Sequence, residues 1–297
     1  MVKVKVPAST SNLGSGFDTF GLALQLYLTI EMEITPAGLQ IFTAGEQSTQ
    51  IPTNEDNLIF QSTKTFYEKL GEPLPGLKIK IENQIPIFRG LGSSGAATVA
   101  GLVCASRLSN LTLTNQEILS LANEIEGHPE NAASSLLGGL TINCLAEGKV
   151  ITKKIAGDEN LKAVLLIPNL TISTHQARRV LPDTVSHQDA VFNLQRSALL
   201  AQAFICQDYR ALKTAMQDKL HQPFRQHFIP GYNEIEQVGY QNGALGICIS
   251  GSGSTILGFT QGDGMPLQKC WQEKAQELNL KARVLVLGID NHGVRCL

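Results

Sequence analysis

A glycine-rich stretch between a strand-like run and a helix-like run constrains the fold of this chain more than any other feature. Residues 77–85 alternate lysine with apolar side chains, which predicts a strand, and the apolar run 96–108 predicts a buried helix. Between them lies Pro86-Ile-Phe-Arg-Gly-Leu-Gly-Ser-Ser-Gly-Ala96. Glycines let the backbone approach a ligand closely, and a helix start offers unpaired N–H groups. The stretch therefore predicts an anion site suited to phosphate, with a plain glycine turn capping a core helix as the alternative.

Known phosphate loops of other kinds do not match this stretch. Residues 90–95 formally fit G-x-G-x-x-G, but that motif needs an acidic residue about 20 positions on, after a second strand. This chain has a helix start there, at residues 112–117. The pattern G-x-x-x-x-G-K-[S/T] is absent, because the one Gly-Lys pair, at residues 148–149, is followed by valine. The loop also lacks a Gly-x-Ser-x-Gly nucleophile elbow, so a phosphate loop here is of a third kind.

The composition indicates a soluble, cytoplasmic globular protein. The chain has 297 residues, 43% of them hydrophobic, which suffices for one large domain or two ordinary ones. A net charge of −2 argues against nonspecific nucleic-acid binding. The apolar runs are too short for a membrane span, and the alternating N-terminus does not resemble a signal peptide. The six cysteines form no CxxC pair and are expected to be small core residues in a reducing compartment.

Periodicity predicts the remaining elements. Strands are expected at residues 2–6 (ended by Pro7), 24–35, 140–146, 150–155, 163–168, 244–249, 255–260 and 281–288. Helices are expected at residues 57–70, 115–125 (behind the capping box of Thr114 and Glu117), 132–137, 173–181, 188–206, 208–220 and 266–279. Residues 8–18, 38–57 and 223–230 are expected to be loops and turns. The elements do not alternate strictly, which predicts an α+β fold with mixed or antiparallel sheets. A polar shift at residues 156–161 predicts two domains, 1–158 and 159–297.

Three further motifs join the glycine loop. They are Pro7-Ala-x-x-Ser-Asn-Leu-Gly-x-Gly-Phe-Asp18, Glu126-Gly-His-Pro-Glu-Asn131 (closing on Leu-Gly-Gly139), and Ile249-Ser-Gly-Ser-Gly253. Together the four resemble, in the right order, the motifs of the GHMP kinases, which include galactokinase, mevalonate kinase and phosphomevalonate kinase. Within this superfamily the chain resembles the homoserine kinase family over nearly its whole length. It departs from the family pattern with Gly95 for alanine, Glu130 for aspartate and Ser254 for proline, which leaves catalytic efficiency open.

The resemblance implies a fold and a nucleotide site. The expected architecture is an N-terminal ribosomal-protein-S5-like domain that binds ATP and a C-terminal ferredoxin-like domain that completes the substrate site. ATP would contact Asn57 and the whole loop, Pro86, Ile87, Phe88, Arg89, Gly90, Leu91, Gly92, Ser93, Ser94, Gly95 and Ala96. Mg²⁺ would be held by Ser94 and one carboxylate, Glu126 or Glu124, because Mg²⁺ prefers oxygen ligands and phosphates. A solvated helix-end carboxylate and, for Asn57, a helix N-cap are the alternatives.

The resemblance also implies a site for L-homoserine, whose carboxylate, amine and hydroxyl each need a partner. Arg178 and Arg225 match the arginines expected on the carboxylate, where a guanidinium fork fits well. Asp18 would accept from the amine. The reacting end would be lined by Asn12, His128 and Asn131, with Thr174 and Gly251 as further substrate contacts. For Arg178 the alternative is that its neighbour, Arg179, is the exposed arginine, and for His128 it is a structural histidine.

The implied function is ATP-dependent phosphorylation of the homoserine hydroxyl, a step of threonine biosynthesis, by a homodimeric enzyme. The catalytic set would be Asn131, His128, Asn12 and Arg178. Mevalonate- and galactokinase-like relatives place a carboxylate where this chain has Asn131, and an amide cannot take a proton. We therefore expect catalysis by positioning and charge neutralisation rather than by a protein base. The alternatives are another GHMP kinase acting on a carboxylate-bearing alcohol, and a nucleotide- or amino-acid-binding protein without turnover.

Overall fold

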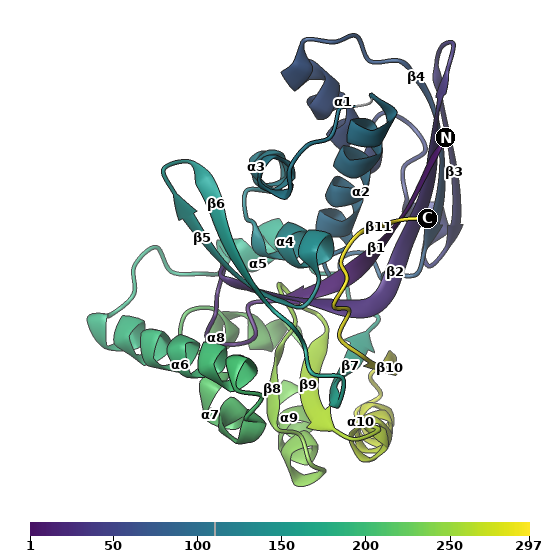
Figure 1. Cartoon of the computed structure of the whole chain (residues 1–297). Helices are drawn as coiled ribbons and strands as arrows, with labels where there is room; N and C mark the ends of the chain where they lie inside the picture. The colour runs from purple at the N-terminus through teal and green to yellow at the C-terminus, as the bar shows by residue number, and fades with distance from the viewer. Residues whose placement is uncertain (110) are drawn as a thin grey trace.

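Two β-sheets organise the chain, and the computed structural model describes residues 1–109 and 111–297 (Figure 1). The first, seven-stranded sheet has the order β11-β1-β2-β4-β3, with the β5–β6 hairpin paired to β2. Only β3 and β4 pair in parallel among the strand pairs of the described residues. The strands are β1 (Val2–Ser11), β2 (Phe20–Thr35), β3 (Leu39–Gly45), β4 (Gly76–Asn83), β5 (Leu140–Ala146), β6 (Lys149–Ile155) and β11 (Arg295–Cys296).

Four helices pack together on one face of this sheet, as Figure 1 shows. They are α1 (Leu58–Leu70), α2 (Ser93–Leu108), α3 (Asn115–Glu126) and α4 (Glu130–Leu137), and a short 3-10 helix, η1 (Ser48–Gln50), follows β3. Helix α2 is buried along nearly its whole length, as its apolar sequence predicts, and it contacts α1, α3, α4 and β1. The capping box at Thr114 starts α3 as predicted. The α2 terminus that follows the glycine loop is thereby fixed against the sheet.

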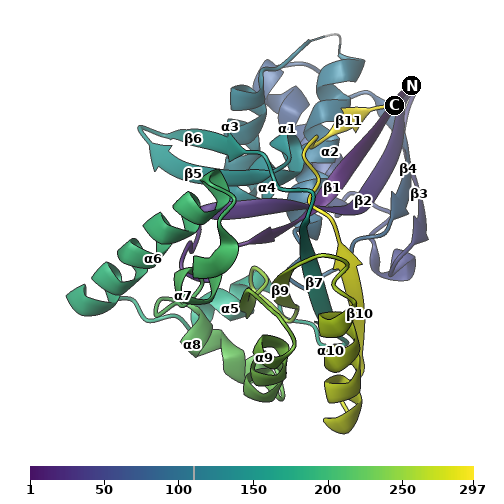
Figure 2. The same ribbon diagram turned by 60° about the horizontal axis from the view of Figure 1, so that its bottom comes forward.

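The second sheet is antiparallel, with four strands in the order β10-β7-β9-β8. It consists of β7 (Leu161–Pro168), β8 (Gly246–Ile249), β9 (Ile256–Gln261) and β10 (Ala282–Leu287). With α9 (Tyr232–Gln241) and α10 (Met265–Glu277), it forms the βαββαβ arrangement of the expected ferredoxin-like unit. Figure 2 shows this unit with the two helices alongside it. The fully buried Trp271 fills its core and donates a hydrogen bond to the carbonyl of Ile235.

Between β7 and β8 the chain forms a helical segment that reaches back toward the first sheet. It contains α5 (Thr174–Arg179), α6 (His187–Ile205), η2 (Tyr209–Ala211), α7 (Leu212–Ala215), α8 (Gln222–Arg225) and η3 (Gln226–Phe228). The two chain ends lie side by side in both views, because β11 pairs with β1 (Figures 1 and 2). The α+β class predicted from the sequence is confirmed, and the division between residues 158 and 159 stays a prediction.

Several predicted element limits are wrong. Strand β1 continues past Pro7 to Ser11, because a register shift between Pro7 and Ala8 accommodates the proline. The polar segment 38–57 contains β3, whose alternating side chains are only partly buried. The helix predicted over 208–220 is reduced to η2 and α7, because the carboxylate of Asp218 accepts the N–H groups of Leu220, His221 and Gln222 and turns the chain. The predicted loop 223–230 instead holds α8 and η3, and α9 and β11 were not predicted.

The cysteines only partly fit the prediction. Cys104 and Cys248 are buried, whereas Cys144, Cys206 and Cys296 are exposed, and all six are free thiols. Burial raises the pKa of the buried Cys104 and Cys248 thiols. In the described part of the chain, no helix combines the length and apolar character that a membrane crossing requires.

Candidate active site

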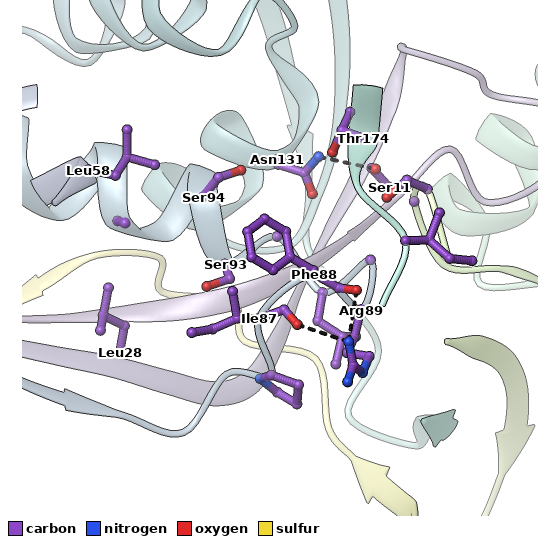
Figure 3. Close-up of a pocket in the computed structure, with 18 of the residues that line it drawn as sticks. Ser11, Leu28, Leu58, Ile87, Phe88, Arg89, Ser93, Ser94, Asn131 and Thr174 are labelled. Atoms are coloured by element: carbon purple, nitrogen blue, oxygen red, sulfur yellow. Dashed lines mark hydrogen bonds between the residues drawn. The ribbon is translucent and has the colours of Figure 1, made fainter. Parts of the chain in front are cut away.

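A cavity of about 460 Å³ opens between the glycine loop, the end of β1 and the helical segment after β7. Figure 3 shows apolar side chains, Leu28 and Leu58, at one end of it. Ser11, Asn131 and Thr174 lie at the other end, with the loop serines between them. The cavity therefore offers an apolar compartment, a backbone-rich centre and a polar compartment in one continuous space.

The glycine loop lies directly on the end of β1 and on the turn between β8 and β9. The amide of Ser9 donates to the carbonyl of Leu91 at 3.1 Å, and the hydroxyl of Ser250 donates to the carbonyl of Gly90 at 2.6 Å. Gly92 has φ 66°, and a Cβ there would lie 1.9 Å from Ser9 Oγ. The left-handed φ and this close approach both require glycine. Gly92 also precedes α2 without a capping side chain, so the first N–H groups of the helix remain available to an anion.

Not every residue of the predicted loop faces the cavity. Residues 86–94 line it, whereas Gly95 and Ala96 are buried inside α2. Arg89 is nearly buried, and its guanidinium donates to Thr171 Oγ1 at 2.8 Å and Asn169 Oδ1 at 3.1 Å. Figure 3 shows its further bonds to the carbonyls of Ile87 and Phe88. Arg89 thus fastens the loop to the second half of the chain.

Asn57 lines the apolar end of the cavity and caps α1. Its Oδ1 accepts from the backbone N–H of Ile59 at 3.0 Å, and its Nδ2 donates to the carbonyl of Pro52 at 2.7 Å. Asn57 is therefore the N-cap of α1, which was the alternative interpretation of this residue, and it lies beside the apolar compartment.

The two candidate metal-binding carboxylates have different surroundings. Glu126 accepts from the Ser94 hydroxyl at 2.7 Å and from Thr98 Oγ1 at 2.7 Å. Glu124 instead forms an exposed ion pair with Lys69 at 2.7 Å. Only Glu126 therefore shares a contact with the loop serine.

Asp18 and Arg178 face each other across the polar end. Their side chains form a bidentate ion pair, with N–O distances of 2.9 and 2.7 Å. Asp18 has φ 53° and Asn12 has φ 71°, so the segment after β1 is held in an uncommon conformation. Asn12 secures it by accepting from the Asp18 amide at 3.0 Å and donating to the Gly251 carbonyl at 2.9 Å. Of the two neighbouring arginines, Arg178 lines the cavity and Arg179 does not.

Arg225 lies deeper and is only 3% exposed. It donates to the carbonyls of Ala177 at 3.0 Å and Gly251 at 3.2 Å. Burial, together with the nearby positive charge of Arg178, lowers the pKa of Arg225 to about 10. Among the described residues no carboxylate lies within ion-pair distance of it. A buried cation without an anionic partner, in a cavity wall, favours an anionic ligand.

Asn131, one of the residues predicted to line the reacting end, is hydrogen-bonded to two serines of β1. Its Nδ2 donates to Ser11 Oγ at 3.2 Å, and its Oδ1 accepts from Ser9 Oγ at 2.9 Å. His128 lies beside it, with Nδ1 3.1 Å from Glu130 Oε1. Burial alone would lower the pKa of His128, but the hydrogen bond and charge of Glu130, and the charge of Glu126, outweigh burial and raise it.

Four residues of the polar end were missed as site residues in the sequence. Ser9, Ser11, Phe17 and Glu130 stand inside the quoted motifs, but small hydroxyls, a phenyl ring and a carboxylate in a motif do not by themselves indicate contacts. Phe17 lies 5.6 Å from the Arg178 guanidinium and 5.2 Å from that of Arg225, measured to the ring centroid. It therefore packs beside both cations.

Comparison with known proteins identifies the class that this fold and loop define. The model of the GHMP kinases N-terminal domain matches residues 57–139, which include the glycine loop and the His128 motif. The crystal structure of homoserine kinase from Cytophaga hutchinsonii has a TM-score of 0.90 at 26% identity, covering 100% of this chain and 97% of that one. The chain is thus a kinase of the GHMP class, as predicted.

Full-length relatives narrow the assignment. A homoserine kinase of Desulfitobacterium hafniense is 40% identical over 294 residues, 99% of each chain. A homoserine kinase of Petrotoga mobilis is 39% identical over 297 residues, 100% of this chain and 97% of that protein. The chain belongs to the homoserine kinase family.

The raised pKa of His128 predicts a pH dependence of stability. A histidine whose folded pKa exceeds its unfolded value of about 6.5 stabilises the fold below that pH and ceases to do so as pH rises through the folded pKa. The free energy of unfolding should therefore differ most between wild type and His128→Gln below pH 6.5, and the difference should shrink above it. Urea unfolding at a series of pH values measures this, with exposed His187→Gln as the control. A difference that grows with pH contradicts the prediction.

Proposed function

We propose that this kinase transfers the γ-phosphoryl group of ATP to the side-chain hydroxyl of L-homoserine, giving O-phospho-L-homoserine for threonine biosynthesis. The observation that carries the proposal is the buried Arg225, a cation in the cavity wall that forms no ion pair among the described residues. It calls for a substrate with a carboxylate. The relatives named homoserine kinase, about 40% identical over the full chain, support the same substrate.

The nucleotide would lie along the loop from the apolar compartment to Ser94. Backbone N–H groups from Gly90 to the start of α2 would bind the phosphates, and Leu28, Leu58 and Phe88 line the compartment left for the base. The base would then be held by apolar contact rather than by charge, since Arg89 is turned toward Asn169.

The oxygen atoms of two side chains next to the loop are suitable ligands for Mg²⁺. Ser94 and Glu126 provide the hard oxygen ligands that Mg²⁺ prefers. No group of three or more His, Cys, Asp or Glu residues in the described ranges could hold a metal ion by itself, so phosphate oxygens would complete the coordination. Bound there, Mg²⁺ would neutralise charge on the phosphates.

Homoserine would be oriented by the polar end. Its carboxylate would pair with Arg225 and the edge of Arg178, and its ammonium with Asp18, which Arg178 already holds in place. Its hydroxyl would then lie at Asn131, against the loop. Because an amide cannot accept a proton from the hydroxyl, the transfer would depend on alignment and on stabilised charge. The homodimer and the cytoplasmic location are likewise proposed on resemblance.

Substrate choice is tested by ADP release from ATP and Mg²⁺ with homoserine, mevalonate, galactose or buffer alone. We expect release with homoserine only, since the site provides partners for both a carboxylate and an ammonium group. Equal release with mevalonate would point to the broader class of carboxylate-bearing alcohols. Absence of release with every compound would contradict turnover altogether.

Arg225→Lys tests the carboxylate site. Lysine keeps the charge but loses the planar fork, and losing one charged hydrogen bond costs about 1.5–3 kcal/mol, or about 10- to 100-fold in affinity. We expect the KM for homoserine to rise by that factor while the KM for ATP stays nearly constant. Exposed Arg179→Lys, on the same side of the cavity but outside its wall, is the matched control. Equal effects on both substrates would argue against a carboxylate contact.

Glu126→Gln tests the metal site. Removal of the carboxylate should lower kcat at least about 10-fold and raise the Mg²⁺ concentration needed for half-maximal rate. Glu124→Gln removes a neighbouring carboxylate from an exposed ion pair, so its effect should stay within about twofold. The assignment is contradicted when Glu124→Gln, rather than Glu126→Gln, shifts the Mg²⁺ requirement.

A further inference from the structure

Glu130, the first residue of α4, is a buried carboxylate in the wall of the polar compartment. The residue is 2% exposed. Oε1 accepts from Asn131 Nδ2 at 3.0 Å and lies 3.1 Å from His128 Nδ1, whereas Oε2 is buried without a hydrogen-bond partner among the described residues. Burying a carboxylate so incompletely paired is costly. The cost indicates that the position of Glu130 serves the site rather than stability.

The hydrogen bonds of Asn131 show what Glu130 does. A side-chain amide has two N–H donors and two acceptor lone pairs. Both donors of Asn131 are occupied, by Ser11 Oγ and Glu130 Oε1, and one lone pair of Oδ1 accepts from Ser9 Oγ. One lone pair on Oδ1 is left for a substrate. This oxygen also lies beside the phosphate loop, since a Cβ on Gly92 would be 2.9 Å from it.

The identity of the two amide ends follows from chemistry. A serine hydroxyl can donate or accept, so Ser9 and Ser11 would tolerate either orientation of the amide. An ionised carboxylate only accepts, so Glu130 requires the nitrogen on its own side. Of the three partners of Asn131, Glu130 alone therefore determines which end of the amide faces the loop.

We propose that Glu130 is a positioning residue for phosphoryl transfer, which holds the amide of Asn131 so that only its carbonyl oxygen is offered to the reacting hydroxyl. The inference rests on the proposed homoserine kinase activity. The carbonyl oxygen accepts a hydrogen bond from the hydroxyl, and this directs a lone pair of the hydroxyl oxygen toward the γ-phosphate. As the new O–P bond forms and the bond from the γ-phosphorus to ADP breaks, the hydroxyl proton passes to an oxygen of the transferred phosphoryl group and not to the amide. With the amide reversed, an N–H group would bind that lone pair and compete with the transfer.

The same contact explains why position 131 holds an amide. A carboxylate there would place two anionic oxygens at about the 3.0 Å that now separates Asn131 Nδ2 from Glu130 Oε1. Like charges at this distance cannot both remain ionised without a large penalty. Glu130 and Asn131 are therefore a matched acceptor–donor pair. Asn131→Asp destroys this match, whereas Glu130→Gln removes only the requirement for one amide orientation, because glutamine can donate or accept. Exchanging both residues should restore a match, since a glutamine at position 130 can donate to an aspartate at position 131.

The experiment is a double-mutant cycle of wild type, Glu130→Gln, Asn131→Asp and the double variant, with kcat and KM measured for homoserine and ATP. We expect Glu130→Gln to lower kcat about 10-fold and Asn131→Asp about 100-fold, with the KM for ATP within about twofold. The double variant should regain about 10-fold over Asn131→Asp alone. The proposal would be overturned if the fold-change in kcat of the double variant equalled the product of the two single fold-changes. It would also be overturned if Asn131→Asp kept the kcat of the wild type.

Two controls separate positioning from folding. Glu130→Asp keeps an acceptor-only group and should retain a higher kcat than Glu130→Gln, whereas Glu234→Gln changes an exposed carboxylate on α9 and should leave kcat unchanged. The urea concentration at the unfolding midpoint measures the Glu130–Asn131 contact independently of enzymatic activity. Asn131→Asp should lower this midpoint, and the double variant should restore it. If the wild type releases no ADP with homoserine, the proposed function fails. The Glu130–Asn131 pairing is tested separately by the urea midpoints, and it is overturned if the midpoint change of the double variant equals the sum of the changes in the two single variants.

Discussion

The close contact of the glycine loop with the end of β1 is the constraint on which the site depends. A Cβ at Gly92 would collide with Ser9 Oγ at 1.9 Å, and one at Gly90 would collide with the Ser250 carbonyl at 2.0 Å. Side chains are therefore excluded on both sides of the loop. This proximity brings the start of α2, with its free N–H groups, next to the residues that follow β1. The proposed phosphate site and the proposed substrate site therefore lie on either side of one backbone contact.

Residues far apart in the chain meet at the carbonyl of Gly251. It accepts from Asn12 at 2.9 Å and from Arg225 at 3.2 Å, and the Gly251 amide donates to the Ser11 carbonyl at 3.1 Å. The turn between β8 and β9 therefore joins the first sheet to the buried arginine. Neither sheet with its helices holds the complete proposed site, since the loop comes from one and Arg178 and Arg225 follow β7. A shift between the two would alter the distance from the carboxylate site to the phosphate loop.

Sequence patterns predicted correctly the strands and helices that have strong local signals. They failed where contacts between distant parts of the chain determine the limits of an element. The strand, loop and helix around residues 86–96 and the box at Thr114 follow from periodicity and caps. Strand β1 passes Pro7 because a bulge absorbs the proline, which no local pattern signals. The motifs supplied most residues of the proposed site, but spacing could not choose between Glu124 and Glu126. The structure gives them different surroundings, with Glu126 bonded to Ser94 and Glu124 paired with Lys69, and the proposal of Glu126 rests on this difference.

The polar compartment contains charged side chains of both signs, and they differ in whether they have a partner of opposite charge. Asp18 is bound by Arg178, and Glu130 lies against His128, so each of these carboxylates has a basic neighbour. Arg225 lacks such a partner within the described ranges, and burial lowers its pKa to about 10. An anionic group that enters the cavity would pair with Arg225, whereas a neutral sugar would leave its positive charge without a partner. The neutral amide of Asn131 then lies between this charged set and the phosphate loop, where a further negative charge would oppose both Glu130 and ATP.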